Sequence, residues 1–128
     1  RILFPRSEIA REVLADDLRK AGAHVTEVIA YRTIAAEPSR EGDPDIYKML
    51  LERQVDAVTF TSASAVRLFA RALGEEQAPD LLATTVVASI GPVTAEAAQQ
   101  IGIRSTIVPK EFTVPALVDA LVAYFRQH

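Results

Sequence analysis

The 128-residue chain is organised around residues 56–66, which read DAVTFTSASAV. The first half of this stretch is a short apolar run rich in β-branched residues, which is typical of a buried strand. The second half opens a helix, with Ser62 or Ser64 as the N-cap. A strand that turns directly into a helix places hydroxyls and free backbone N–H groups at the carboxyl edge of a sheet. In an open α/β sheet, ligands bind at this edge.

A second stretch repeats this design, because residues 86–95 read VVASIGPVTA and predict a strand, a glycine turn and a helix started by proline. Working outward, hydrophobic periodicity predicts five strands alternating with five helices. Such alternation favours an α/β fold of the flavodoxin-like type: a parallel five-stranded sheet of order 2-1-3-4-5 with helices on both faces. The predicted strands cover residues 2–4, 25–30, 56–61, 85–89 and 105–108. The predicted helices cover 8–21 after a Ser7 cap, 45–53, 63–73, 92–101 and the segment after a Thr113 cap, with an acidic loop at 74–80.

Composition narrows the function classes. With 49% hydrophobic and 24% charged residues the chain has the composition of a soluble globular protein, and its net charge of −3 gives no basic field for nucleic acid or an anionic membrane. The absence of cysteine excludes disulfides, thiol catalysis and thiolate metal sites. No apolar run approaches the roughly 20 residues of a membrane span and no signal peptide is visible, so we expect a cytoplasmic protein. The chain enters a strand directly after Arg1, so we also expect a segment of a longer protein.

Most enzyme signatures are missing from the sequence, including the dinucleotide, P-loop and nucleophile-elbow motifs. His24 and His128 lie far apart in the chain, so we predict two ordinary surface residues and no metal site. A receiver domain shares the predicted fold but needs acidic residues after strands one and three. Pro5-Arg6 and Thr61-Ser62 occupy those places, which excludes that class.

The remaining candidates for chemistry are hydroxyls and backbone donors. Thr61, Ser62 and Ser64 follow the third predicted strand, whereas Gly91 and Thr94 follow the fourth. Glycine allows close approach of a ligand to the backbone, and the first N–H groups of a helix attract anions, so this edge suits carboxylates. Ser62 and Thr94 could instead serve only to cap or solvate the helix starts.

Two further residues have open interpretations. Arg6 could face an anionic ligand or be a solvated surface arginine. Tyr31 ends the second predicted strand, where it is either a packed hinge aromatic or a site residue.

Four features in order along the chain resemble the C-terminal half of the uroporphyrinogen-III synthase family. Each is weak alone, but together and at fitting distances they span nearly the whole chain. They are Ile2-Leu3-Phe4-Pro5-Arg6 with Arg11-Glu12-x-Leu14; Gly22-Ala23-x-Val25 running to Tyr31-Arg32-Thr33; residues 56–62 with Val66; and Ile90-Gly91-Pro92-x-Thr94-Ala95 with Gly102.

This resemblance implies a lyase of haem and other tetrapyrrole biosynthesis that needs no metal or cofactor. The family cyclises hydroxymethylbilane to uroporphyrinogen III with inversion of ring D and loss of water, largely by holding the substrate in shape. The substrate is rich in carboxylates, so Arg6 and the hydroxyls and donors after strands three and four would bind it. By resemblance Tyr31 is the candidate proton donor to the departing hydroxyl, and Thr94 lines the cleft.

The resemblance also implies a division of the chain. Family members are about twice as long and have two flavodoxin-like domains. Residues 1–30 would form a βαβ unit packed in one domain, 31–44 a connector, and 45–128 an α/β segment of the other. Alone, the chain could close on itself or exchange residues 1–30 with a second copy, and we expect it to be inactive as a monomer. The alternatives to an enzyme fragment are a non-catalytic anion-binding or regulatory module and a structural domain without a ligand.

Overall fold

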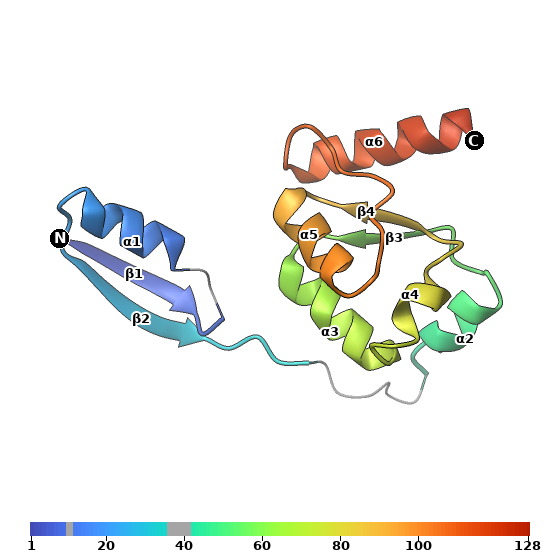
Figure 1. Ribbon diagram of the computed structural model, residues 1–128, viewed down its shortest axis with the longest axis horizontal. Coiled ribbons are helices and arrows are strands. Elements are labelled where there is room, and N and C mark those ends of the chain that lie inside the picture. The colour runs from blue at the N-terminus through green and yellow to red at the C-terminus, as the bar shows by residue number, and fades with distance from the viewer. Residues whose placement is uncertain (10–11, 36–41) are drawn as a thin grey trace. The chain divides into compact units, whose positions relative to one another are not determined.

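A computed structural model describes residues 1–9, 12–35 and 42–128, and the chain divides into two compact units, Arg1–Ala36 and Glu37–His128 (Figure 1). Residues 10–11 of the first predicted helix and residues 36–41 of the predicted connector lie outside the described residues. Both units are of the α/β type. Within the described residues, no helix is long and apolar enough to cross a membrane.

The first unit is a two-stranded parallel sheet with one helix. Strands β1 (Ile2–Ser7) and β2 (Val25–Tyr31) pair in register from Ile2 with Val25, and helix α1 (Val13–Lys20) connects them. Ala15 of α1 is fully buried. The alternate side chains Leu3 and Val28 are exposed, so one face of this sheet is left without a core.

One prediction for this unit was wrong. Ser7 was expected to cap the first helix, but it is the buried last residue of β1. The physical reason is that the strand ladder continues past it, because the Glu8 amide donates to the Tyr31 carbonyl at 3.0 Å. Helix α1 therefore starts later, with Glu12 at its N-cap and no capping bond from that side chain.

The second unit is built on β3 (Ala57–Phe60) and β4 (Val86–Ser89), which are parallel and pair from Ala57 with Val86 to Phe60 with Ser89. On the far side of β4 a single bridge joins Ala88 to Ile107. Helices lie on both faces of this small sheet (Figure 1). They are α2 (Ile46–Leu51), α3 (Ala63–Leu73), α4 (Ala78–Leu81), α5 (Pro92–Gln100) and α6 (Val114–Gln127).

Alternation along β4 separates two cores. Val87 belongs to the larger core with α3 and α5, whereas Ala88 belongs to the smaller one beneath α6. The larger core is formed by Leu50, Phe60, Val66, Ala70, Leu73, Ala78, Leu81, Leu82, Val87, Ala98 and Ile103.

The structure differs from the single five-stranded sheet expected from the sequence. Its described residues form two sheets of two strands each, of order β1-β2 and β3-β4. The fifth predicted strand, 105–108, is reduced to the bridge at Ile107, because Pro109 follows and has no N–H to extend the ladder. The predicted loop at 74–80 also contains the start of α4, which is fixed by burial of Ala78 and Leu81.

Candidate functional site

The turn from β3 into α3 gathers three hydroxyls. Ser62 is the N-cap of α3, and its Oγ accepts a hydrogen bond from the Ala65 amide at 3.1 Å. The Ser64 Oγ lies 3.2 Å from the Ser62 Oγ, so the two hydroxyls form a bonded pair. Thr61, directly after the strand, is exposed. The capping role weighed for Ser62 is therefore confirmed, and it leaves the outer hydroxyls of Thr61 and Ser64 beside the start of a helix.

The turn from β4 into α5 is formed by Gly91 and Pro92, and the apolar ring of Phe112 lies against it. Gly91 is the N-cap, its carbonyl accepts from the Ala95 amide at 3.0 Å, and Pro92 is the first helical residue. The backbone of Gly91 is extended (φ −167°), a conformation that any residue adopts. The ring of Phe112 lies close to this backbone, because an added Cβ at Gly91 would be 3.2 Å from its Cγ and 3.3 Å from its Cδ1, so the ring would have to shift to accept a side chain there.

The two turns lie side by side at one edge of the sheet. Phe60 pairs with Ser89, and the Ile90 amide donates to the Phe60 carbonyl at 2.9 Å. Since β3 and β4 are parallel, both carboxyl ends meet there. The structure thus places Thr61, Ser62, Ser64, Gly91 and Thr94 on the same edge, as their positions in the sequence predict.

Burial distinguishes the members of this set. Thr94 is only 4% exposed, so its side chain is part of the packing under α5. Behind the edge, fully buried Ser89 shares a hydrogen bond of 2.8 Å with Ser105, Oγ to Oγ. Sequence reasoning missed this pair, since the contact joins residues 16 positions apart and neither has a local signal.

The other two predicted site residues belong to the first unit. The side chain of Arg6 is 14% exposed, and its guanidinium pairs with Glu27 (Nε to Oε1, 2.9 Å) and with Glu12 (Nη2 to Oε1, 3.5 Å). Tyr31, the last residue of β2, is 62% exposed. Arg6 is thus held among carboxylates of its own unit, whereas the ring of Tyr31 is open to solvent.

Glu27 is the centre of this charge cluster. A hydrogen bond from Arg19 is the main cause that holds the pKa of Glu27 below its ordinary value of 4.5, and the positive charges of Arg19 and Arg6 add to it. Partial desolvation acts in the opposite direction and is the weaker effect overall. The same hydrogen bond raises the pKa of Arg19. This arrangement is suited to fixing α1 on the sheet.

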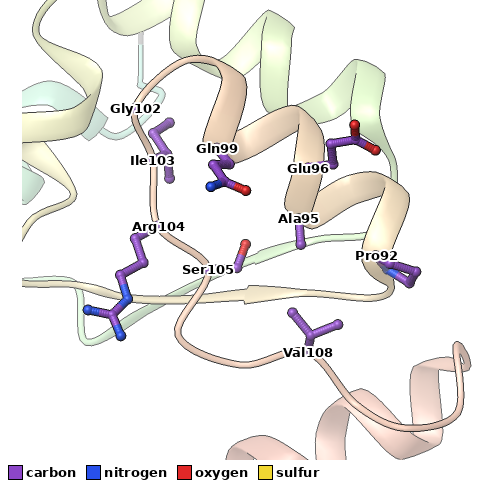
Figure 2. A pocket seen from close by; sticks show the side chains of 9 residues that line it. All are labelled: Pro92, Ala95, Glu96, Gln99, Gly102, Ile103, Arg104, Ser105 and Val108. Atoms are coloured by element: carbon purple, nitrogen blue, oxygen red, sulfur yellow. The ribbon is translucent and has the colours of Figure 1, made fainter.

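A groove lies along α5. It has a volume of about 750 Å³, and Figure 2 shows the side chains of Gln99 and Ser105 on its wall. Among the predicted site residues none lines it. Its lining consists of Pro92, Ala95, Glu96, Gln99, Gly102, Ile103, Arg104, Ser105 and Val108. The described residues, 1–9, 12–35 and 42–128, contain no group of three or more His, Asp and Glu side chains that could hold a metal ion.

The family model described as uroporphyrinogen-III synthase HemD matches residues 1–119. The chain belongs to the uroporphyrinogen-III synthase family. It is 33% identical over 131 residues to the uroporphyrinogen-III synthase of Synechococcus elongatus, covering 99% of this chain and 48% of that protein. It is 28% identical over 119 residues to that of Chlorobaculum parvum, covering 93% and 46%.

Solved structures of the family share the fold. The uroporphyrinogen-III synthetase of Helicobacter pylori aligns with a TM-score of 0.70 at 18% identity, over 95% of this chain and 52% of that one. The synthase of Thermus thermophilus aligns with a TM-score of 0.63 at 20% identity, over 97% and 50%. The chain therefore spans about half the length of the family members it matches.

Proposed function

We propose that this chain is the C-terminal half of a cytoplasmic uroporphyrinogen-III synthase, a lyase that closes hydroxymethylbilane to uroporphyrinogen III with inversion of ring D and loss of water. The observation that carries the proposal is the family match over residues 1–119. The donor-bearing edge after β3 and β4 supports it, because a substrate rich in carboxylates needs such donors.

The edge would act as a receptor for substrate carboxylates. Thr61 and Ser64 offer hydroxyls that can donate hydrogen bonds, and Ser62 orients Ser64 while capping α3. At the second turn Pro92 has no N–H, so the free donors are the next amides of α5, at Val93 and Thr94. These amides lie at the positive end of the helix dipole, which favours an anion.

Tyr31 would supply the proton. Loss of the substrate hydroxyl as water needs a proton donor beside it, and the phenol of a tyrosine carries an O–H that can donate. Its exposure at the end of β2 leaves the ring accessible to a ligand. Arg6 is less suited to bind the substrate, since its guanidinium already pairs with Glu27 and Glu12.

The active assembly would need more strands than this chain pairs by itself. Within the described residues β1 pairs only with β2, and β3 pairs only with β4 and not with a strand on its other side. We propose that residues 1–30 act as a transferable βαβ unit, 31–44 as the connector, and 45–128 as a segment completed to a five-stranded flavodoxin-like domain. In the isolated chain, a second copy would provide the missing unit by exchange of residues 1–30.

The assembly proposal is tested by multi-angle light scattering. We expect a dimer of the isolated chain whose mass is independent of added salt, because apolar strands and not surface charges would join the copies. A monomer at high concentration would contradict the exchange.

The function is tested by turnover in the complete gene product. We expect it to convert hydroxymethylbilane to the inverted isomer, resolved from the non-inverted ring by chromatography. General acid catalysis is worth on the order of 10²–10⁴ in rate, so Tyr31→Phe should lower kcat at least about tenfold with an unchanged melting temperature. Formation of only the non-inverted ring by the wild type would refute the function. A Tyr31→Phe variant within about twofold of wild type would remove the acid role alone.

A further inference from the structure

Phe112 is an exposed aromatic residue at the same edge as the two turns. It lies in the loop between the bridge at Ile107 and the start of α6, and this loop follows the third parallel segment of the sheet. Its side chain is 61% exposed. The neighbouring Pro109 is buried, so the loop itself is anchored and Phe112 is held outward on it.

The ring is nevertheless held in a defined place. An added Cβ at Gly91 would lie 3.2 Å from Cγ and 3.3 Å from Cδ1 of Phe112, which is closer than nine in ten real Cβ contacts. One side of the ring therefore packs on the backbone of the turn that opens α5. Since the Gly91 backbone is extended, this contact and not a special φ angle makes glycine the fitting residue.

The contact places an aromatic surface beside backbone hydrogen-bond donors. The free side of an aromatic ring offers an apolar π surface, and the unpaired amides of α5 beside it offer hydrogen bonds to an anion. A ligand that fits both is a flat aromatic ring carrying carboxylate arms. A pyrrole ring with its acidic side chains has this chemistry.

We propose that Phe112 contacts the substrate, with its ring packed on one pyrrole of the tetrapyrrole while the first free amides of α5 receive a carboxylate of that same pyrrole. This inference rests on the proposed function. Gly91 then has the role of seating Phe112, so that the ring lies beside the donors. The other possible occupant of the exposed ring is the remainder of a longer chain, and the test separates the two.

The test measures kcat, KM and melting temperature of the complete protein with hydroxymethylbilane. An aromatic contact is worth about two- to tenfold in affinity beyond its buried area, so Phe112→Ala should raise KM by at least that factor. The kcat value should stay within about twofold, because the contact is made in both ground and transition states. Phe112→Tyr keeps the ring and should restore KM, whereas Phe112→Leu should not.

The outcomes separate the two proposals. If the wild type makes no inverted product, the proposed function falls and this inference falls with it. If the wild type is active but Phe112→Ala and Phe112→Leu keep its KM, only the role of Phe112 is overturned. A large fall in melting temperature with unchanged KM would also overturn it, and would assign the ring to packing against the rest of the chain.

A double-mutant cycle tests the Gly91 contact without any activity assay. Gly91→Ala alone should lower the melting temperature, because the new Cβ meets the ring. In the Phe112→Ala background the same change should have a smaller effect, since the two atoms nearest to that Cβ, Cγ and Cδ1 of Phe112, would be gone. Equal effects in both backgrounds would overturn the seating role.

Discussion

Removal of the Ser62 hydroxyl should weaken α3 by a measurable amount. The Ser62 Oγ accepts the Ala65 amide at 3.1 Å, and the helix it caps contributes Val66, Ala70 and Leu73 to the larger core. Replacing a serine cap by alanine costs about 1 kcal/mol. In a domain of 60–100 residues this corresponds to a fall in melting temperature of about 4–8 °C, so we expect a shift of that size for Ser62→Ala.

The control variants assign the effect to the cap. Asparagine caps helices as well as serine does, so Ser62→Asn should keep the melting temperature of the wild type. Ser64→Ala removes the hydroxyl bonded to Ser62 but not the cap, and should have a smaller effect. Thermal unfolding followed by circular dichroism measures all three. A Ser62→Ala variant within about 1 °C of wild type would refute the reasoning, because the cap would then contribute nothing.

The same variants separate stability from substrate binding. If the Ser62 hydroxyl also orients Ser64 toward a substrate carboxylate, Ser62→Asn should raise KM in the complete enzyme although its fold is intact. Unchanged KM in Ser62→Asn would limit Ser62 to capping.

Two further predictions follow from burial and charge. Because Thr94 is 4% exposed, Thr94→Ala should lower the melting temperature, whereas the KM of the folded enzyme should change less than about twofold. Calorimetry measures the first effect and turnover assays measure the second. A change in KM without a change in melting temperature would place the hydroxyl in the substrate cleft. The pKa of Glu27 is lower in the folded first unit than in the unfolded chain, so this group adds stability above pH 4.5 that is lost as the pH falls through its folded value. Glu27→Gln should therefore flatten the acid dependence of amide exchange in β1 and β2, and an unchanged profile would contradict the role of the Arg19 hydrogen bond.

Local signals predicted the elements that carry the site. A β-branched run followed by serines fixed the β3–α3 turn, and the Ser62 and Thr113 caps are confirmed by bonds to the amides of Ala65 and Ala116. These features depend on residues within four positions of one another, so the sequence alone determines them.

Features that depend on distant partners were not predicted. The contact of Phe112 with Gly91 joins two loops, and neither residue carries a sign of the other. Ser7 has the composition of a cap but is drawn into β1 by pairing with β2. The last predicted strand failed in a similar way, since its length was set by one partner strand and a following proline.

The apolar surface of α6 is wider than the part that packs on the sheet of β3 and β4. Leu117 and Leu121 pack on the sheet, yet Val118, Val122 and Phe125 on the adjoining side of the helix are exposed. A helix with an apolar face wider than the sheet it covers fits a sheet with more strands. The open position within the described residues is beside β3, and a parallel strand paired there would end next to Thr61. We therefore expect that whichever segment completes the sheet also adds a third turn to the donor-bearing edge. Folding and catalysis would then both depend on that strand, because the hydroxyls and amides alone do not provide the enclosure needed to hold a tetrapyrrole in its reactive shape.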